Sequence, residues 1–362
     1  MKLHHGKILK KKYGYKIIDC ELCKFIHIDP IPSAQKLKNL YRINYYKNIK
    51  PDFIKKHETE IEYWNAIYDE KLDTMKRYVK SKTKKILDIG CGPGFFLKRS
   101  KHYKWDVFGI EPSQIAAEYA EKHGIPVVKD FFQNLDLQKL GKFNAIYMHD
   151  VLEHCSDPSE ILKNCNTLLK NNGIIVIETP NDFNPLQKVV QKALKKTEYW
   201  LAPPQHINYF NFTSLTNLLE KNGFQILLKE STFPLELFLL MGINYIGNDK
   251  VGKKIHKNRI KMEMNFKNAL LVAFAEEQVL QHPAQVGVVR PILESEASAV
   301  VQVGDELARR VLAEHLDRRR HLLLGDLGVV DPVLFPGGGI QRDDLAQRGA
   351  QVHRIADLER RR

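Results

Sequence analysis

The stretch Lys84–Leu97, KKILDIGCGPGFFL, carries the strongest structural signal in this 362-residue chain. A short apolar segment, KILDI, leads into glycines at positions 90, 92 and 94, and an apolar helical pattern follows. A strand, a glycine-rich turn and a helix in this order predict a unit in which a ligand lies against bare backbone. The residues around the glycines indicate which ligand that is.

Two acidic residues favour a positively charged adenosine ligand over a dinucleotide. The glycines read G-x-G-x-G, and Phe95 stands where the dinucleotide fingerprint has its third glycine. Asp88, at the end of the strand, would repel a pyrophosphate and attract a cation or an ammonium group. Glu111 ends the next expected strand, where an acid can bind both hydroxyls of a ribose. S-adenosylmethionine, a sulfonium with an amino-acid tail, meets both conditions.

Strands and helices alternate from Lys84 onward, which predicts a parallel sheet covered by helices on both faces. The expected strands are KILDI, DVFGIE, PVVKD, FNAIYMHD, GIIVIE and, after an irregular insertion, FQILLKES. The first expected helix follows the glycine loop and runs through Leu97, and the others cover residues 113–123, 158–169 and 214–222. Residues 1–30 are expected to form short extended segments, and residues 33–80 are rich in helical and aromatic patterns.

The motifs together resemble those of class I S-adenosylmethionine-dependent methyltransferases. They are DIGCGPG at 88–94, EPS at 111–113, DVLEH at 150–154 and LLKNNG at 168–173. Residues 20–32, the tyrosine-rich segment 40–46 and WLAPPQHINYF at 200–210 resemble a bacterial subgroup that acts on small molecules. In that subgroup a short zinc-ribbon-like head precedes the catalytic domain. The resemblance covers about residues 1–267 and implies an α/β, Rossmann-like, doubly wound and mostly parallel sheet.

The resemblance also implies which residues bind the cofactor. They are Asp88, Gly90, Gly92, Gly94, Glu111, Asp130, Phe131, His149 and Asp150. The glycines would lie under the methionine part, Asp88 at its ammonium group and Glu111 at the ribose. The pair 130–131 would lie near the adenine, and the pair 149–150 beside the sulfonium and the substrate mouth. Three simpler alternatives are a helix cap for Asp130, a helix start for residues 153–154 and a small buried side chain for Cys91.

Methyl transfer from a sulfonium mainly requires an acceptor held in line with the methyl group and protected from water. A hydroxyl acceptor also benefits from a base, and His206 is the first choice because it lies in the insertion at the carboxyl edge of the sheet. His149 is the second choice. The alternative for His206 is a histidine that hydrogen-bonds a loop and holds the insertion in shape. The expected substrate-binding residues are Asn181, Asp182, Trp200, His206 and Tyr209.

The pair Cys20-x-x-Cys23 supplies two of the four ligands that a structural zinc site requires. No second C-x-x-C is present, so His4 and His5 would complete the site. The alternative is a free, reduced pair in a small β-hairpin. The chain has five cysteines, an odd and small number that suits a reducing cytoplasm better than a disulfide framework. We therefore expect a cytoplasmic protein.

The formal net charge of +13 could indicate a nucleic-acid partner. The lysines are scattered, however, with clusters only at 7–16 and 250–261, and a solvated basic surface is the preferred interpretation. No apolar run reaches the length of a membrane span. The sequence therefore favours a small-molecule methyl acceptor, with nucleic acid and membrane not expected as partners, and it leaves the oligomeric state open.

Composition changes abruptly after Lys267, because all 40 lysines lie at or before it and 12 of the 16 arginines lie beyond it. We interpret the remainder as a foreign tail, either a fused segment or, preferably, a sequence artefact. The expected organisation is a head at 1–32, a helical cap at 33–80, a methyltransferase domain at 81–267 and the tail at 268–362. Class I folds normally finish with an antiparallel seventh strand, and no convincing segment for it lies before Lys267. If the tail replaces the native end, the sheet is expected to be incomplete.

The favoured function is O-methylation of a small molecule, such as a sugar or another intermediate of a cell-surface or secondary pathway. N-methylation and C-methylation are open alternatives. Two further hypotheses are an RNA-modifying methyltransferase and a domain that binds the cofactor without turnover.

Overall fold

The structure is a computed structural model that describes residues 4–265 and 284–291. All of these residues belong to one compact unit, which spans residues 1–298. None of the helices in these two ranges is both long and apolar enough to cross a membrane.

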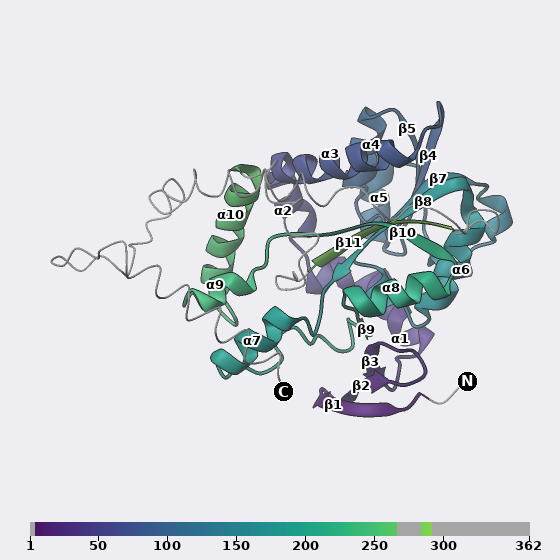
Figure 1. Cartoon of the computed structure of the whole chain (residues 1–362). Coiled ribbons are helices and arrows are strands. Elements are labelled where there is room, and N and C mark those ends of the chain that lie inside the picture. Colours follow the sequence, from purple (N-terminus) through teal and green to yellow (C-terminus); the bar gives the residue numbers. More distant parts are fainter. Residues whose placement is uncertain (1–3, 266–283, 292–362) are drawn as a thin grey trace, which may run out of the picture. The chain divides into compact units, whose positions relative to one another are not determined.

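A seven-stranded sheet forms the centre of this unit, with strand order β10-β11-β8-β7-β4-β5-β6 (Figure 1). Its parallel strands are β4 (Lys84–Ile89), β5 (Trp105–Ile110), β6 (Val127–Val128), β7 (Phe143–His149) and β8 (Leu169–Pro180). Strands β4 and β7 lie inside the sheet, and their continuous apolar runs are buried on both faces, as parallel sheets require. The predicted doubly wound α/β fold is confirmed.

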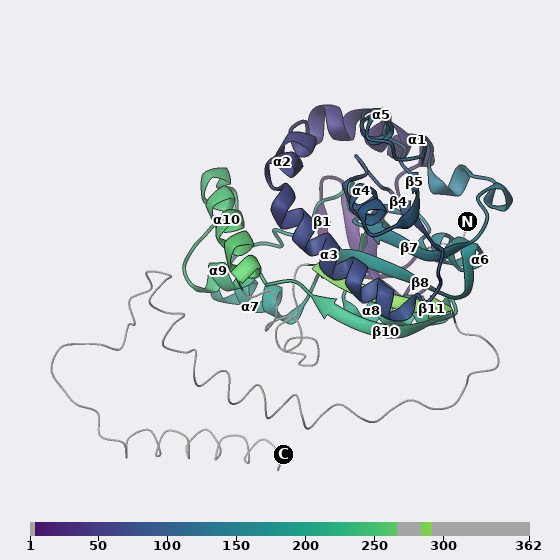
Figure 2. The same ribbon diagram turned by 90° about the horizontal axis from the view of Figure 1, so that it is seen from above.

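Helices cover both faces of the sheet (Figures 1 and 2). One face packs against α4 (Phe95–His102) and α5 (Gln114–Lys122), and the other against α6 (Pro158–Leu168) and α8 (Phe212–Lys221). The helix starts follow from local chemistry. Asp157 accepts a hydrogen bond from Glu160 N ahead of the proline at the first turn of α6, and Asn211 forms a capping box with Ser214 at α8.

The seventh strand comes from beyond the break in composition. Strand β11 (Ala284–Pro291) lies between β8 and β10 (Phe224–Ser231) and pairs antiparallel with both. The sheet is therefore not left incomplete, and part of the segment 268–362 belongs to the same sheet as the expected domain 81–267. This placement of β11 has no local sequence signal, because strands pair through their backbone groups, and composition does not reveal such pairing. The rest of the segment 268–362 lies outside the described residues.

A second, four-stranded sheet forms the head. It contains β1 (Gly6–Lys12), β2 (Tyr15–Cys20), β3 (Ile26–Asp29) and β9 (Asn208–Tyr209), in that order. Strand β9 belongs to the insertion after β8, so two segments far apart in the sequence share one sheet. The backbone bond from Ile28 N to Ile207 O, 2.9 Å long, extends this pairing. The head and the insertion therefore form one structural element.

A helical cap joins the head to the main sheet. It consists of α1 (Ala34–Asn39), the π-helix η1 (Leu40–Ile49), α2 (Phe53–Thr59) and α3 (Ile61–Tyr78). Two hydrogen bonds of 2.5 and 2.7 Å from Arg99 of α4 to Asp69 hold α3 in place. Helix α10 (Asp249–Asn265) contacts α3 from outside, where Tyr63 donates a 2.6 Å hydrogen bond to Glu263.

Three further helical turns follow the strands, at η2 (Phe132–Asn134), η3 (Leu137–Lys139) and η4 (Leu152–His154). Helices α7 (Pro185–Ala193) and α9 (Glu236–Leu240) pack against each other beside the insertion (Figure 2).

We expect a chain that ends at residue 267 to be less stable than one that ends at residue 298. The shorter chain lacks β11, so β8 loses one partner strand and β10 loses its connection to the sheet. At about 1 kcal/mol net for each backbone hydrogen bond, the free energy of unfolding should fall by at least about 3 kcal/mol. Urea unfolding followed by circular dichroism measures the difference, and equal midpoints for the two chains would contradict it.

Candidate active site

A cavity of about 670 Å³ lies at the carboxyl ends of β4, β5 and β7. In open parallel sheets this edge is where ligands bind. The ends of these strands contribute Asp88, Glu111, His149 and Asp150 to the cavity wall, and η1, α2 and α3 contribute the opposite wall. The cavity therefore brings together residues from the sheet and from the helical cap.

The glycine loop passes so close to its neighbours that side chains would not fit. A Cβ atom on Gly90 would lie 2.6 Å from Val151 Cγ2, and one on Gly92 would lie 2.8 Å from the hydroxyl oxygen of Tyr46. Both glycines also have positive φ angles, 74° and 52°. Cys91 between them is buried, in agreement with its interpretation as a small interior residue.

Glu111 ties the end of β5 to the glycine loop. One carboxylate oxygen accepts a 2.9 Å hydrogen bond from Gly92 N and the other a 2.8 Å bond from Ser113 N. Burial raises the pKa of Glu111 to about 7, while these two backbone donors act in the opposite direction. Each oxygen keeps a lone pair for another donor, which suits a pair of ribose hydroxyls.

Asp88 is 3% exposed and lies at the cavity floor. Burial, together with the nearby Glu111, raises its pKa well above the usual range. Within residues 4–265 and 284–291 no ion pair involves Asp88, so a buried carboxyl faces the cavity without a cation. A ligand with an ammonium or sulfonium group would supply the missing positive charge.

The two residues that were expected near the adenine, Asp130 and Phe131, differ in their position relative to the cavity. Phe131 lines the cavity, whereas Asp130 is not among its lining residues. Asp130 Oδ1 instead accepts hydrogen bonds from Phe131 N, at 2.8 Å, and from Asn134 Nδ2, at 2.9 Å. These bonds are those of a turn cap, so a contact of Asp130 with the cofactor stays a prediction. Gly94 also lies outside the lining, at the start of α4.

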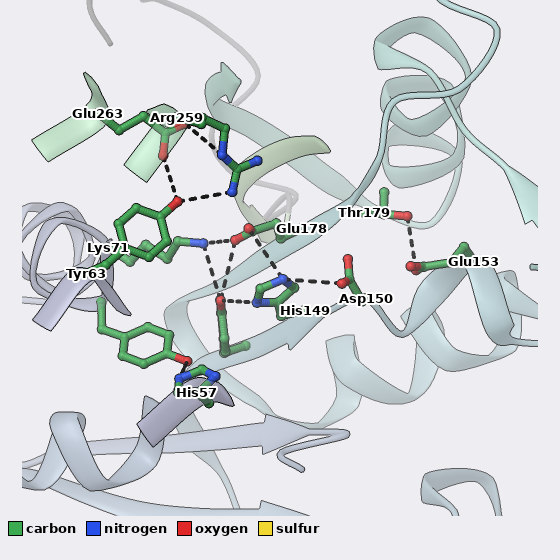
Figure 3. Close-up of polar contacts among 12 residues, drawn as sticks. His57, Tyr63, Lys71, His149, Asp150, Glu153, Glu178, Thr179, Arg259 and Glu263 are labelled. Carbon is green, nitrogen blue, oxygen red and sulfur yellow. Dashed lines mark hydrogen bonds and ion pairs between the residues drawn. The ribbon is translucent and has the colours of Figure 1, made fainter. Parts of the chain in front are cut away.

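His149 and Asp150 stand side by side at the end of β7 (Figure 3). His149 Nε2 lies 3.5 Å from Asp150 Oδ2 and 3.6 Å from Glu178 Oε1. Burial alone would raise the pKa of Asp150, but His149 holds it below its usual range. The backbone N–H of Asp150 donates a 2.9 Å bond to the carbonyl of Glu178, which fixes this turn on β8. The cavity thus contains an imidazole between two carboxylates.

His206 lies behind the cavity wall and not in it. Its ring contacts the ring of His154, with centroids 5.0 Å apart, and His154 lines the cavity. Burial and the neighbouring His154 lower the pKa of His206 to about 4, so the imidazole is neutral at physiological pH. His206 Nδ1 is buried and has no hydrogen-bond partner among the described residues. Its role as a base stays a prediction.

The other predicted substrate-binding residues are also absent from the cavity lining; they are Asn181, Asp182, Trp200 and Tyr209. Tyr209 belongs to β9, is 1% exposed and packs in the core of the head. Asp182 is buried below α7, and burial raises its pKa well above the usual range. The insertion carries Trp200 and Tyr209 to the core of the head. The substrate contacts of all four residues stay predictions.

The sequence did not indicate which individual aromatic residues form the wall of the cavity. His57 stacks between Phe95, at 4.1 Å between ring centroids, and Trp64, at 4.6 Å. Tyr68 is hydrogen-bonded to His57 Nε2 at 3.0 Å, and burial lowers the pKa of His57 to about 3. The only sequence signal was the aromatic content of residues 33–80, which gives no indication of which rings face a ligand.

Four residues of the head could hold a metal ion, but they differ from the predicted set. Ligand atoms of His4, Cys20, Cys23 and His27 all lie within 4.8 Å of one another. His5 instead forms an exposed 3.4 Å ion pair with Glu21. His27 replaces it because β3 pairs with β2 and brings His27 to the same end of the sheet. The structure thus groups His27, and not His5, with His4 and the two cysteines, and a metal-binding role for His5 stays a prediction.

The comparisons with known proteins agree with this geometry. A family described as a methyltransferase domain matches residues 62–229, and the sheet has the antiparallel seventh strand that the resemblance implied.

The chain contains a class I methyltransferase domain. The cofactor of this domain is S-adenosylmethionine, and the cavity fits it. Gly90 and Gly92 leave no room for a side chain, and the buried Asp88 and Glu111 have no cationic partner within residues 4–265 and 284–291.

Several similar proteins are ubiquinone biosynthesis O-methyltransferases. The protein from Actinobacillus pleuropneumoniae serotype 5b is 28% identical over 153 residues, which cover 36% of this chain and 65% of that protein. The protein from Glaesserella parasuis is 32% identical over 159 residues, which cover 39% and 66%. The chain spans less than two thirds of the length of either relative.

Among solved structures, a SAM-dependent methyltransferase from Archaeoglobus fulgidus is similar, with a TM-score of 0.40 and 19% identity. The similarity covers 64% of this chain and 97% of that protein. The fold assignment depends on the strand order of the methyltransferase domain and not on this similarity.

We expect the affinity for S-adenosylmethionine to rise with pH up to about 7 and to level off above it. Burial raises the pKa of Glu111 to about 7, and only the ionised carboxylate can accept hydrogen bonds from both ribose hydroxyls. Below that pH, the affinity should fall by up to about tenfold for each pH unit. Calorimetric titration at pH 5.5, 7 and 8.5 measures the effect.

Two variants serve as controls for this expectation. Glu111→Gln should bind weakly at every pH and lose the part of the pH dependence that is centred near pH 7, while any contribution from Asp88 remains. Glu121→Gln, which changes an exposed carboxyl at the end of α5, should behave as the unaltered protein. An affinity that does not depend on pH in the unaltered protein would show that Glu111 does not need its charge.

Proposed function

We propose that this protein transfers the methyl group of S-adenosylmethionine to a hydroxyl group of a small-molecule acceptor. One observation carries the proposal. The glycine loop with Glu111 and the pair His149–Asp150 line the same cavity, which an aromatic wall closes on the other side. The relatives are ubiquinone biosynthesis O-methyltransferases, which supports oxygen as the acceptor atom.

In this proposal the cofactor lies along the ends of β4 and β5. Asp88 binds its ammonium group, the loop at 90–94 lies under its methionine part, Glu111 binds its ribose, and residues 130–131 lie near its adenine. When bound, it supplies a methyl group that is activated by attachment to a sulfonium. The remaining steps depend on residues of this chain.

The acceptor would lie beside His149, against the rings of the cap. Tyr45, Phe53 and Trp64 line this side of the cavity, and they favour an acceptor with a flat or apolar body. Such a wall also keeps water from the reacting groups. His149 would take the proton of the acceptor hydroxyl, so that the electron pair of the O–H bond stays on the oxygen. As this oxygen bonds to the methyl carbon, the carbon–sulfur bond would break and its electron pair would go to the sulfur, so that the neutral demethylated cofactor is the leaving group. His206 is the second candidate for this role, and Asn181, Asp182, Trp200 and Tyr209 are proposed to contact the acceptor from the insertion.

The first test is calorimetric titration of S-adenosylmethionine and its demethylated product into the full chain. We expect binding of both and its loss in Glu111→Ala. Transfer of a labelled methyl group is then measured with catechol, with a sugar and with total RNA as acceptors. Labelling of RNA alone would favour an RNA-modifying enzyme, and binding without any transfer would favour a domain without turnover. The folded protein's failure to bind the cofactor would overturn the proposal.

We also propose that the head holds a structural zinc ion through Cys20, Cys23, His4 and His27. His27 Nδ1 lies 2.8 Å from the carbonyl oxygen of Ile28, and this bond leaves Nε2 available as a ligand. His4 Nδ1 lies 3.4 Å from Cys23 Sγ and 3.7 Å from Cys20 Sγ. Two thiolates and two imidazoles form a common tetrahedral zinc site.

We further propose that the protein is cytoplasmic, since all five cysteines are free.

The metal content of the purified full chain tests the zinc proposal. We expect stoichiometric zinc, its loss in His27→Ala and its retention in His5→Ala, because His5 points to Glu21 and not to the cysteines. Removal of zinc by a chelator should lower the melting temperature of the unaltered chain. Equal zinc loss in the two histidine variants, or a chain purified without zinc, would contradict the assignment.

A further inference from the structure

A buried network of hydrogen bonds lies directly behind His149 (Figure 3). It contains Lys71 of α3, Tyr147 of β7 and Glu178 of β8. Their side chains are almost completely inaccessible, and Lys71 forms an ion pair with Glu178. None of the three residues was singled out by a sequence motif, and none takes part directly in the proposed reaction.

The hydroxyl of Tyr147 is the centre of this network. Its oxygen lies 3.4 Å from Lys71 Nζ, 3.4 Å from Glu178 Oε2 and 3.2 Å from His149 Nδ1. Burial raises the pKa of Tyr147 well above the usual range, so the hydroxyl keeps its proton. A hydroxyl has one hydrogen to donate and two lone pairs to accept with. All three neighbours can be satisfied in one arrangement.

That arrangement follows from the chemistry of the neighbours. An ammonium group such as that of Lys71 can only donate, and an ionised carboxylate such as that of Glu178 can only accept. Tyr147 therefore donates its hydrogen to Glu178 and accepts one from Lys71. Its second lone pair then accepts from His149, which requires the imidazole proton to be on Nδ1. If Tyr147 instead donated its hydrogen to His149 Nδ1, the buried carboxylate of Glu178 would lose that hydrogen-bond donor.

With the proton on Nδ1, His149 Nε2 is unprotonated. It lies 3.5 Å from Asp150 Oδ2 and 3.6 Å from Glu178 Oε1, which is longer than the usual N–H···O hydrogen bond of about 2.9 Å. The distances suit an ion pair that forms once Nε2 has taken up a proton. Both carboxylates would then stabilise the imidazolium. The charged and titratable groups that face His149 are thus Asp150, Glu178 and, through Tyr147, Lys71, with His57 of α2 nearby.

We propose that Tyr147, held between Lys71 and Glu178, fixes His149 in the tautomer whose unprotonated Nε2 faces Asp150, a residue of the cavity wall. Lys71, Tyr147 and Glu178 are positioning residues, because they act through His149 and not on the acceptor. The use of this tautomer to take the acceptor proton rests on the proposed function. The tautomer itself does not, because it follows from the hydrogen bonds of the free protein.

The experiment is ¹⁵N NMR of the full chain with labelled histidine, with the His149 signals assigned by their loss in His149→Gln. We expect a protonated Nδ1 and an unprotonated Nε2. Tyr147→Phe keeps the ring, which packs on Phe96 at 4.0 Å between centroids, and removes only the hydroxyl. In this variant we expect the proton to move to Nε2, where it can bond to the carboxylates.

Tyr63→Phe is the matched control. Tyr63 lies on α3 and, like Tyr147, is buried. Its hydroxyl is hydrogen-bonded to Glu263 at 2.6 Å and to Arg259 at 3.2 Å, and Tyr63 does not line the cavity. Its variant should leave the His149 signals unchanged. With catechol as the acceptor, Tyr147→Phe should lower kcat about 10- to 100-fold at unchanged affinity for S-adenosylmethionine, and Tyr63→Phe should not.

The outcomes separate this inference from the proposed function. A protonated Nε2 in the unaltered protein, or His149 signals that are the same in Tyr147→Phe, would overturn the inference even if methyl transfer is observed. The expected signals in both proteins would support the inference even if catechol is not methylated, because the NMR measurement needs no acceptor. An absence of cofactor binding would count against the proposed function alone.

Discussion

The hydrogen bond from Gly92 N to the carboxylate of Glu111 is the contact on which the rest of the site depends. It joins the turn after β4 to the end of β5, and the second carboxylate oxygen is bound by Ser113 N. The turn can follow this path only because its glycines adopt positive φ angles and leave room for Val151 and Tyr46. A single buried acid thus fixes the shape of the loop and presents its remaining lone pairs to the cavity.

Charge is distributed very differently on the two sides of this cavity. On the cofactor side, Asp88 and Glu111 are buried without a positive partner among the described side chains, and the pKa of each is raised. Their charge is costly in the free protein, and a cationic ligand would relieve that cost. Beside His149, Glu178 is paired with Lys71 and Tyr147, so its charge is already balanced. The unpaired acids Asp88 and Glu111 are suited to binding a cationic ligand. The balanced group around Glu178 is suited to orienting the neighbouring imidazole of His149.

The head and the insertion contribute to the site indirectly. Strand β9 of the insertion completes the head sheet, and Ile207 N donates a 2.8 Å bond to the carbonyl of Glu153, in the turn after β7. Tyr41 of the cap is hydrogen-bonded to His154 at 2.8 Å in the same turn. A metal ion in the head would therefore stabilise the sheet that carries the insertion, at a distance from the cofactor residues. This arrangement accounts for the burial of Tyr209 and for the position of His206 behind the wall.

The sequence by itself determined the parallel sheet, the glycine loop and the two acids of the cofactor side, because each depends on residues close together in the chain. Alternating apolar runs specify strands and helices, and G-x-G-x-G after Asp88 specifies a turn that only glycine can form. Tertiary structure alone decided the rest. The choice of His27 over His5, the placement of β11 within the sheet and the grouping of Lys71, Tyr147 and Glu178 behind His149 all join segments that are distant in sequence. Such contacts are set by strand register and helix packing, which leave no local pattern in the residues that make them.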